Sequence, residues 1–201
     1  MSHELAAFAD IYESDVELVS VQTHTAEHAV DPTLLAGHHI NEKWTQSAGD
    51  REVIAEHVNK TLNPASTGPL VDQIGAATDL LEELLGCNAV GIRIATLNGP
   101  MCPKFHVDQV PCRLLITLLG PGTEWICDDD ADRTALANRA VDIVPVRETG
   151  AVQHLESGSW SLLKGGTWDD DTFDGVVHRS PHYAGDRLLI SIDPMFVDPA
   201  A

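Results

Sequence analysis

The stretch KFHVDQVPCRLLITLLGPGTEWI, residues 104–126, places His106 and Asp108 two positions apart, directly before a long apolar run. In an extended strand, residues i and i+2 point to the same face, so these two metal-binding side chains should project together while Val107 points away. The apolar run, residues 112–119, has the composition of a buried strand and ends in a Gly-Pro-Gly turn. The stretch therefore predicts a β-built core that carries a metal site on its inner face.

The rest of the second half of the sequence is also rich in predicted strands. Short β-rich runs alternate with Gly, Pro and Asp turns, which predicts a β barrel or sandwich with little helix. These runs are AVGIRIATL (89–97), TEWIC (123–127), VDIVPV (141–146), AVQHL (151–155), SWSLLKG (159–165), DGVVH (174–178) and RLLISID (187–193).

The first half differs from the second. After a predicted strand over residues 16–22, the sequence as far as Cys87 is expected to be helical. One helix should begin after Asp50, a capping residue, and stop before Pro64. A second amphipathic helix should have Pro69 in its first turn and end at Gly86. We expect one structural unit, in which residues 1–88 buttress a core formed by residues 89–201.

Charge and composition exclude several classes of function. The chain has 201 residues and a net charge of −19, with only 12 Lys and Arg, so nucleic acid and anionic membrane surfaces would be repelled. No apolar run approaches the ~20 residues of a membrane helix, and no secretory signal is visible, so a cytoplasmic protein is expected. The four cysteines show no CxxC pair and should be reduced. The acidic runs CDDDADR and WDDDTFD fail the EF-hand template and are interpreted as solvated loops.

A third metal ligand can come from DGVVHRSP, where His178 ends a short β run. Two His and one carboxylate on one face of a metal leave the opposite positions open, as in non-haem Fe(II) oxygenases. Nine residues later Arg187 opens the strand RLLISID, and a fixed guanidinium there can bind a carboxylate with two parallel hydrogen bonds.

This order of HxD, distal His and Arg resembles the Fe(II)/2-oxoglutarate-dependent dioxygenases, whose core is a jelly roll, the cupin-like double-stranded β-helix. Over most of the chain, and most strongly over residues 89–194, the sequence more closely resembles the bacterial DUF1826 family. The segments that carry this likeness are KFHVDQVPCRLLITLLGPGTEWI, LLKGGTWDDDTFDGVVHRSP and RLLISID. The expected fold is thus α+β, a jelly-roll barrel with N-terminal helices.

The oxygenase resemblance implies that His106, Asp108 and His178 are iron ligands and that Arg187 binds the distal carboxylate of 2-oxoglutarate. Many members have a Ser two residues after that Arg, where this chain has Leu189. Ser191, on the same strand face, is the candidate to replace it. The substrate is expected to be a small molecule or a protein side chain, and the oligomeric state is not predicted.

The sequence also allows other roles for several residues and other functions for the chain. Arg93 lies in an apolar strand, which suits either a contact to the bound co-substrate or a structural ion pair. Cys102 is a candidate fourth ligand that would complete a tetrahedral zinc site, making the chain a metal-binding protein without redox chemistry. A cupin-like isomerase or hydrolase is a further alternative. The histidines His24, His28, His38 and His39 would form a second site if helical, but surface positions are favoured.

Overall fold

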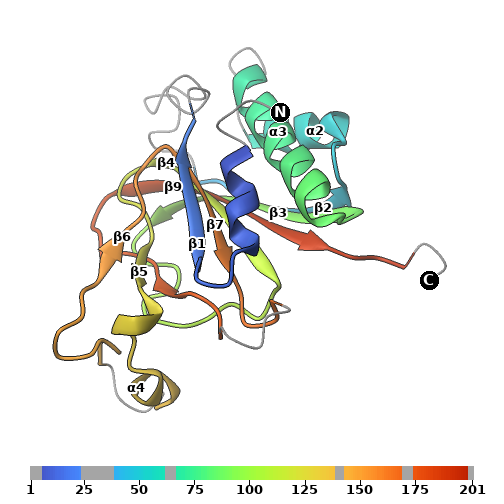
Figure 1. Ribbon diagram of the computed structural model, residues 1–201. Helices are drawn as coiled ribbons and strands as arrows, with labels where there is room; N and C mark the ends of the chain where they lie inside the picture. The colour runs from blue at the N-terminus through green and yellow to red at the C-terminus, as the bar shows by residue number, and fades with distance from the viewer. Residues whose placement is uncertain (1–5, 24–38, 62–66, 139–142, 169–173, 199–201) are drawn as a thin grey trace.

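The computed structural model describes residues 6–23, 39–61, 67–138, 143–168 and 174–198. In these residues the chain forms a six-stranded and a three-stranded antiparallel sheet, and two longer helices lie against the larger sheet (Figure 1). Sheets and helices occupy separate stretches of the sequence for the most part, so the fold is α+β, as expected.

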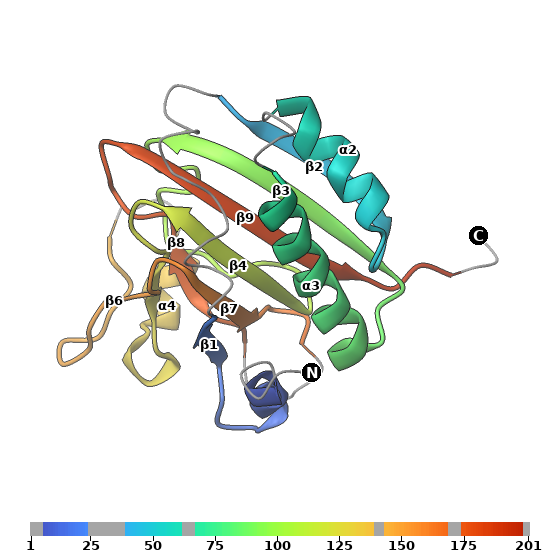
Figure 2. The same ribbon diagram turned by 90° about the horizontal axis from the view of Figure 1, so that it is seen from above.

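The large sheet has the strand order β1-β7-β4-β9-β3-β2 (Figure 2). Its long strands β3, β4 and β9 coincide with the apolar runs of the sequence, because alternate residues of each strand are buried on the two faces of the sheet. In sheet order the strands are β1 (Leu18–Gln22), β7 (Ser159–Lys164), β4 (Cys112–Leu119), β9 (Asp186–Met195), β3 (Ala89–Asn98) and β2 (Asn41–Ser47).

The small sheet has the order β6-β5-β8, with β6 at Gln153–His154, β5 at Glu124–Ile126 and β8 at Val177–Arg179. A short helix, α4 (Arg133–Ala137), follows β5 and is capped by the Asp132 carboxylate, which accepts a hydrogen bond from the Ala135 N–H at 2.9 Å. Two 3₁₀ helices, Ala7–Tyr12 and Asp128–Asp130, complete the described elements.

Both predicted N-terminal helices form. In α2 (Arg51–Thr61), the Asp50 carboxylate accepts a hydrogen bond from the Val53 N–H at 3.2 Å, which confirms the predicted cap. Helix α3 (Gly68–Leu85) has its proline in the first turn and ends at Gly86, whose φ of 68° is the left-handed conformation that glycine adopts without strain.

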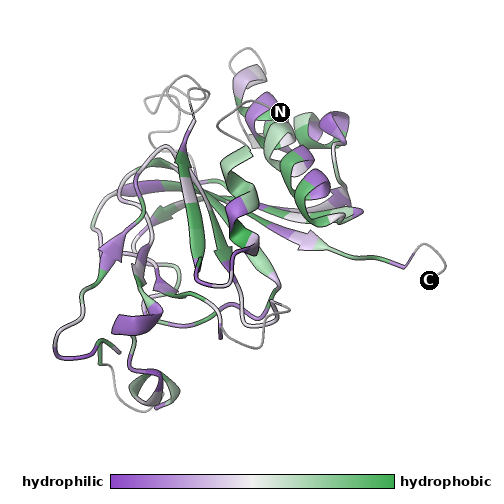
Figure 3. Ribbon diagram, in the orientation of Figure 1, coloured by the Kyte–Doolittle hydropathy of each residue, from purple (hydrophilic) through white to green (hydrophobic). Residues whose placement is uncertain are grey.

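The two faces of the large sheet have different partners. One face packs against α3 and α2, and its buried residues include Leu114, Ile190 and Ile192. The other face, which we call the site face, carries a smaller apolar cluster that includes Leu115 and Leu189. The hydropathy colouring shows that the strands of the sheet are largely apolar and that the helices beside it carry both apolar and polar residues (Figure 3). Polar residues on the site face are therefore exceptions within an apolar layer.

The expectation of a purely helical segment between residues 23 and 87 is wrong, because Asn41–Ser47 forms the edge strand β2. Its sequence, NEKWTQS, is polar because the strand pairs only with β3 and buries only Trp44 and Gln46. The described part of the run at 141–146 forms only a single bridge, between Val146 and Ala131. The closed jelly-roll barrel stays a prediction.

Across the part of the chain that the structure describes, no helix combines the length and the apolar character needed to cross a membrane.

Candidate metal centre

His106 and His178 face each other across paired backbone segments. The His106 N–H donates to the His178 carbonyl at 3.0 Å, and the His178 N–H donates to the His106 carbonyl at 2.9 Å. His178 lies in β8, as predicted, whereas His106 and Asp108 do not lie in a regular strand. They occupy an extended segment that this one bridge pins beside β8. The bridge replaces the strand that the alternating pattern predicted.

Both imidazoles are oriented by the backbone. The Nδ1 of His106 lies 3.0 Å from the Lys104 carbonyl, and the Nδ1 of His178 lies 3.0 Å from the Val176 carbonyl. Since a carbonyl can only accept, each Nδ1 carries the proton. Each Nε2 then keeps its lone pair and can bind a metal ion. A backbone hydrogen bond of this kind is the usual partner of a metal-binding histidine.

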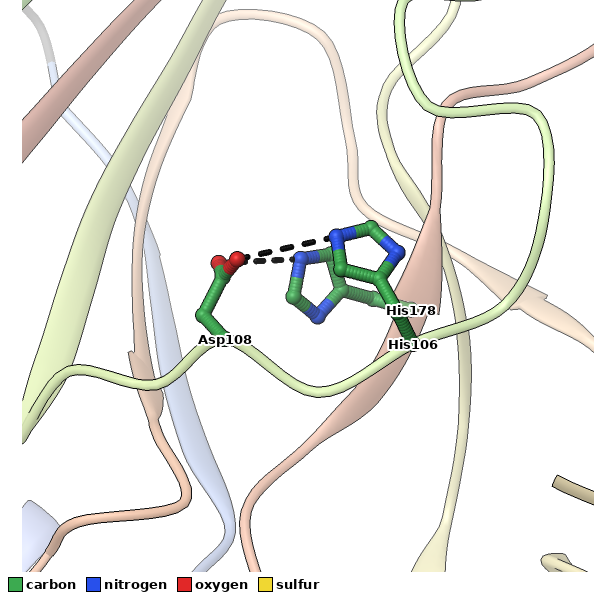
Figure 4. A group of neighbouring side chains, drawn as sticks. All are labelled: His106, Asp108 and His178. Carbon is green, nitrogen blue, oxygen red and sulfur yellow. Dashed lines mark ion pairs between the residues drawn. The ribbon is translucent and has the colours of Figure 1, made fainter. Parts of the chain in front are cut away.

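The Asp108 carboxylate faces both Nε2 atoms (Figure 4). Its oxygens lie 3.6 Å from the Nε2 of His106 and 3.2 Å from the Nε2 of His178. One ligand atom from each of the three residues falls within 4.8 Å of the others. The structure thus brings together the three predicted ligands, although 72 residues separate the two histidines in sequence.

The electrostatics favour an ionised Asp108. Burial by itself disfavours the charged form, but the closeness of the two imidazoles and the charge of Arg113 outweigh it and hold the pKa of Asp108 well below its ordinary value. In turn the Asp108 carboxylate favours the protonated form of His106 and raises its pKa, against the opposing effect of burial. An anion between two imidazoles is a favourable place for a divalent cation.

Arg113 and Asp193, which the sequence analysis did not single out, hold Asp108 in place. The NH1 of Arg113 donates to Asp108 Oδ2 at 2.7 Å, while its Nε and NH2 donate to the two oxygens of Asp193 at 2.6 and 2.7 Å. Asp193 and Arg113 lie on neighbouring strands, β9 and β4, on the site face. The available signal was a charged residue within each of two apolar runs, CRLLITLL and RLLISID.

The segment that carries His106 and Asp108 is also held through its backbone. The Gly166 N–H donates to the Asp108 carbonyl at 2.8 Å, and the Gly165 N–H donates to the Pro111 carbonyl at 2.8 Å. A Cβ atom on Gly165 would lie 1.9 Å from the Val110 carbonyl oxygen, so only glycine allows this close approach.

Arg187 is buried, with a relative exposure of 3%, and has no carboxylate partner among the described residues. Its Nε donates to the Pro121 carbonyl at 2.8 Å, and its NH2 donates to Thr123 Oγ1 at 3.0 Å and Thr117 Oγ1 at 3.4 Å. Its buried Nη1 has no hydrogen-bond partner in the part of the chain that the structure describes. Burial lowers the pKa of Arg187 to about 10, so it is still a cation at neutral pH.

The other two predicted co-substrate contacts lie elsewhere on the site face. Ser191 pairs with Arg93 of β3 on one side and with Leu115 of β4 on the other. Arg187 pairs with Leu97, four residues further along β3, which corresponds to about 13 Å along the strands. Leu189, at the position where a Ser was expected, belongs to the apolar cluster of this face.

The remaining candidates are not part of the cluster. The Cys102 sulfur is not among the ligand atoms gathered within 4.8 Å, and the backbone of Cys102 pairs with Ser180 instead. His39 is exposed, and the other three N-terminal histidines, His24, His28 and His38, lie outside the described residues. In the acidic run at 127–133, Asp128 pairs with Arg133. The second acidic run lies mostly outside the described residues.

Comparisons with known proteins give the family and the fold. A family described as "Protein of unknown function (DUF1826)" matches residues 2–193. No curated protein matches the sequence. The rice dioxygenase for auxin oxidation is similar in structure, with a TM-score of 0.50 and 12% identity, over 95% of this chain and 77% of that one. At this identity the likeness shows the fold alone.

Two prolyl hydroxylases are more distant in structure. The Pseudomonas putida prolyl-4-hydroxylase matches with a TM-score of 0.49 and 13% identity, over 96% of this chain and 99% of that one. The viral collagen prolyl hydroxylase from Paramecium Bursaria Chlorella virus-1, solved as a 2OG complex, matches with a TM-score of 0.46 and 12% identity, over 91% and 97%.

Proposed function

The chain belongs to the DUF1826 family, and we propose that it is an Fe(II)- and 2-oxoglutarate-dependent oxygenase. In this proposal His106, Asp108 and His178 hold the iron, and Arg187 binds the distal carboxylate of 2-oxoglutarate. The core, formed mainly by residues 89–201, is a jelly roll, and residues 1–88 supply two edge strands of its large sheet, β1 and β2, and the helices that buttress it. The substrate is a small molecule or a protein side chain.

The observation that carries the proposal is the unpaired guanidinium of Arg187. A buried cation without a counter-ion is costly, and its Nη1, without a partner among the described residues, can donate to an anion that the protein itself does not supply. Arg187 donates to Thr123, which directly precedes β5, and Trp125 of β5 pairs with the proposed ligand His178. A dicarboxylate whose other end binds the metal would satisfy both groups.

The donor set fits Fe(II). Two imidazole nitrogens and one carboxylate leave open coordination positions, the arrangement typical of non-haem iron oxygenases. A zinc site closed by Cys102 is not supported, because that sulfur is not in the cluster. A three-ligand set would also suit a zinc hydrolase, and binding of 2-oxoglutarate to the Fe(II) protein distinguishes the two.

Each of these side chains then has a defined task. When bound, Fe(II) and 2-oxoglutarate supply the activation of dioxygen, with conversion of 2-oxoglutarate to succinate and CO₂. Arg113 fixes the orientation of the Asp108 carboxylate. Arg187, steadied by Pro121 and Thr123, offers the N–H groups of its one unpartnered nitrogen, Nη1, to the co-substrate. Leu115 and Leu189 give this part of the site face an apolar surface that limits water.

The proposal is tested by anaerobic reconstitution with Fe(II), followed by titration of 2-oxoglutarate monitored by visible absorption and calorimetry. Arg187→Met should leave Fe(II) binding nearly unchanged and weaken 2-oxoglutarate binding by about 2–5 kcal/mol, the usual penalty for removing one partner of a buried charge pair. His178→Ala should abolish stoichiometric iron.

The matched control is Arg147→Met, which removes an exposed arginine that also has no carboxylate partner. It should behave as the wild type in both titrations. If the wild type binds Fe(II) but not 2-oxoglutarate, or if Arg187→Met binds it equally well, the oxygenase proposal fails and a metal-binding protein without redox chemistry becomes the better account.

A further inference from the structure

A second unsatisfied arginine lies on the site face. Arg93 of β3 pairs directly with Ser191 of β9 on one side and with Lys43 of β2 on the other. In an antiparallel sheet, directly paired residues project to the same face, so a guanidinium and an ammonium stand side by side. Like charges in this position are destabilising, which calls for a compensating anion.

The protein supplies no such anion among its described residues. The NH2 of Arg93 donates to the neutral Asn41 Oδ1 at 2.9 Å, and its Nε is buried without a partner. Lys43 is exposed and its ammonium makes no ion pair with the rest of the described chain. By contrast, the arginines at 51, 113, 133 and 179 each pair with a carboxylate, and Arg147, which has no carboxylate partner among the described residues, is exposed.

The lack of a carboxylate beside Arg93 and Lys43 is unusual in a chain with 31 acidic residues and only 12 Lys and Arg. The nearest carboxylate in the strand register is Asp193, the next residue after Ser191 on this face of β9. Both of its oxygens already accept hydrogen bonds from Arg113. Its own partner on β3 is Gly91, which has no side chain to fill the space beside Arg93.

Arg93 lies near Asp193, one of the residues that hold the proposed metal ligand Asp108 in place. In the strand register it lies diagonally across from Asp193, at a Cβ separation of roughly 7–8 Å. Asp193 holds Arg113, which holds the proposed metal ligand Asp108. The proposed co-substrate arginine, Arg187, is about 13 Å away along the strands. A molecule bound at Arg93 would therefore lie on the site face, next to the carboxylate that holds Arg113, without occupying the Arg187 site.

We propose that Arg93, assisted by Lys43, binds a carboxylate of the substrate, so that the substrate is an organic acid or an acidic side chain. This inference rests on the proposed function and names the substrate class for it. The guanidinium fork matches the planar carboxylate, and the partly exposed position lets the group enter from solvent. In a protein of net charge −19, this local pair of cations is the place where an acid is attracted.

The test uses benzoate and its neutral isostere benzamide as probes, titrated by calorimetry into Zn(II)-loaded protein saturated with 2-oxoglutarate. Wild type should bind benzoate at least about tenfold more tightly than benzamide, the value of a hydrogen bond to a charged group. Arg93→Met should remove that preference and change neither benzamide nor 2-oxoglutarate affinity by more than about twofold. Lys43→Met should reduce the preference less, because this ammonium is exposed.

Arg147→Met is again the control and should retain the full preference. Should Arg93→Met fail to fold, Arg93→Gln is measured instead, because it removes the charge and keeps a polar side chain. The inference is overturned if wild type shows no preference for benzoate, if Arg93→Met keeps it, or if that variant loses 2-oxoglutarate binding to the same degree. A wild type that does not bind 2-oxoglutarate refutes the proposed function instead, and the probes are then compared in Zn(II)-only protein.

Discussion

Asp193→Asn should weaken metal binding although Asp193 is not a ligand. The substitution keeps the size of the side chain but removes the charge that balances Arg113, whose guanidinium touches Asp108. An uncompensated cation then stands beside the site. At about 7 Å and an effective dielectric of about 40, a unit charge changes the energy of a divalent ion by roughly 2 kcal/mol. The usual loss on mutating such an outer partner, about 10–100-fold in affinity, is of the same size.

The same substitution should lower the free energy of unfolding of metal-free protein only modestly. Arg113 keeps its hydrogen bond to Asp108, and the side chains of Arg113 and Asp193 are 26% and 28% exposed, so solvent screens the lost interaction. We expect a loss of about 1–2 kcal/mol in urea denaturation. The large effect should appear in calorimetric titration with Fe(II) or Zn(II), as an affinity lower by about 10–100-fold.

The control is Asp79→Asn, which removes the same charge from the ion pair between Asp79 of α3 and Arg51 of α2, on the opposite side of the large sheet from the site face. It should leave metal affinity unchanged. If Asp193→Asn binds metal as tightly as wild type, the contacts through Arg113 do not shape the site. If both variants lose affinity equally, the cause is overall charge and the reasoning is equally wrong.

Two further predictions concern the scaffold. Gly165→Ala should lower the free energy of unfolding by about 1–3 kcal/mol and weaken metal binding, because the new Cβ displaces the Val110 carbonyl and with it the segment that carries His106 and Asp108. The control is Gly68→Ala, where a Cβ meets no atom within 4 Å, and it should change neither stability nor metal affinity. Asp50→Ala should lower the free energy of unfolding by about 1 kcal/mol through loss of the α2 cap, with metal affinity unchanged in the same titration.

The helices and long strands could be predicted because their signals are local. Asp50 and Gly86 mark helix ends through their own backbone chemistry, and the apolar runs of β3, β4 and β9 are buried on both faces. Strand β2 was missed because an exposed edge strand needs few apolar residues. Its one large buried side chain, Trp44, stacks on His57 of α2, a contact between residues whose closeness no local pattern reveals.

The three side chains of the candidate metal centre could be proposed from the sequence because HxD and a distal His form a recognisable order, whereas the contact of Arg113 with Asp193 could not. Arg113 and Asp193 are 80 residues apart, and their contact depends on β4 and β9 being neighbours in the sheet. A single sequence does not specify strand order. Arg93 was singled out as a charge in an apolar strand, but its lack of a carboxylate partner is visible only once Lys43 and Ser191 are placed beside it.

The position of β9 has a consequence for the synthesis of the protein. Along the described chain β9 follows every other strand, yet it lies at the centre of the large sheet, between β4 and β3. On the ribosome β3 and β4 therefore each keep an edge that stays open until β9 emerges, and these edges are joined only after the chain has emerged as far as Met195. Open edges of apolar strands pair readily with other chains. We expect nascent or truncated chains that lack β9 to aggregate and to depend on chaperones until that strand is inserted.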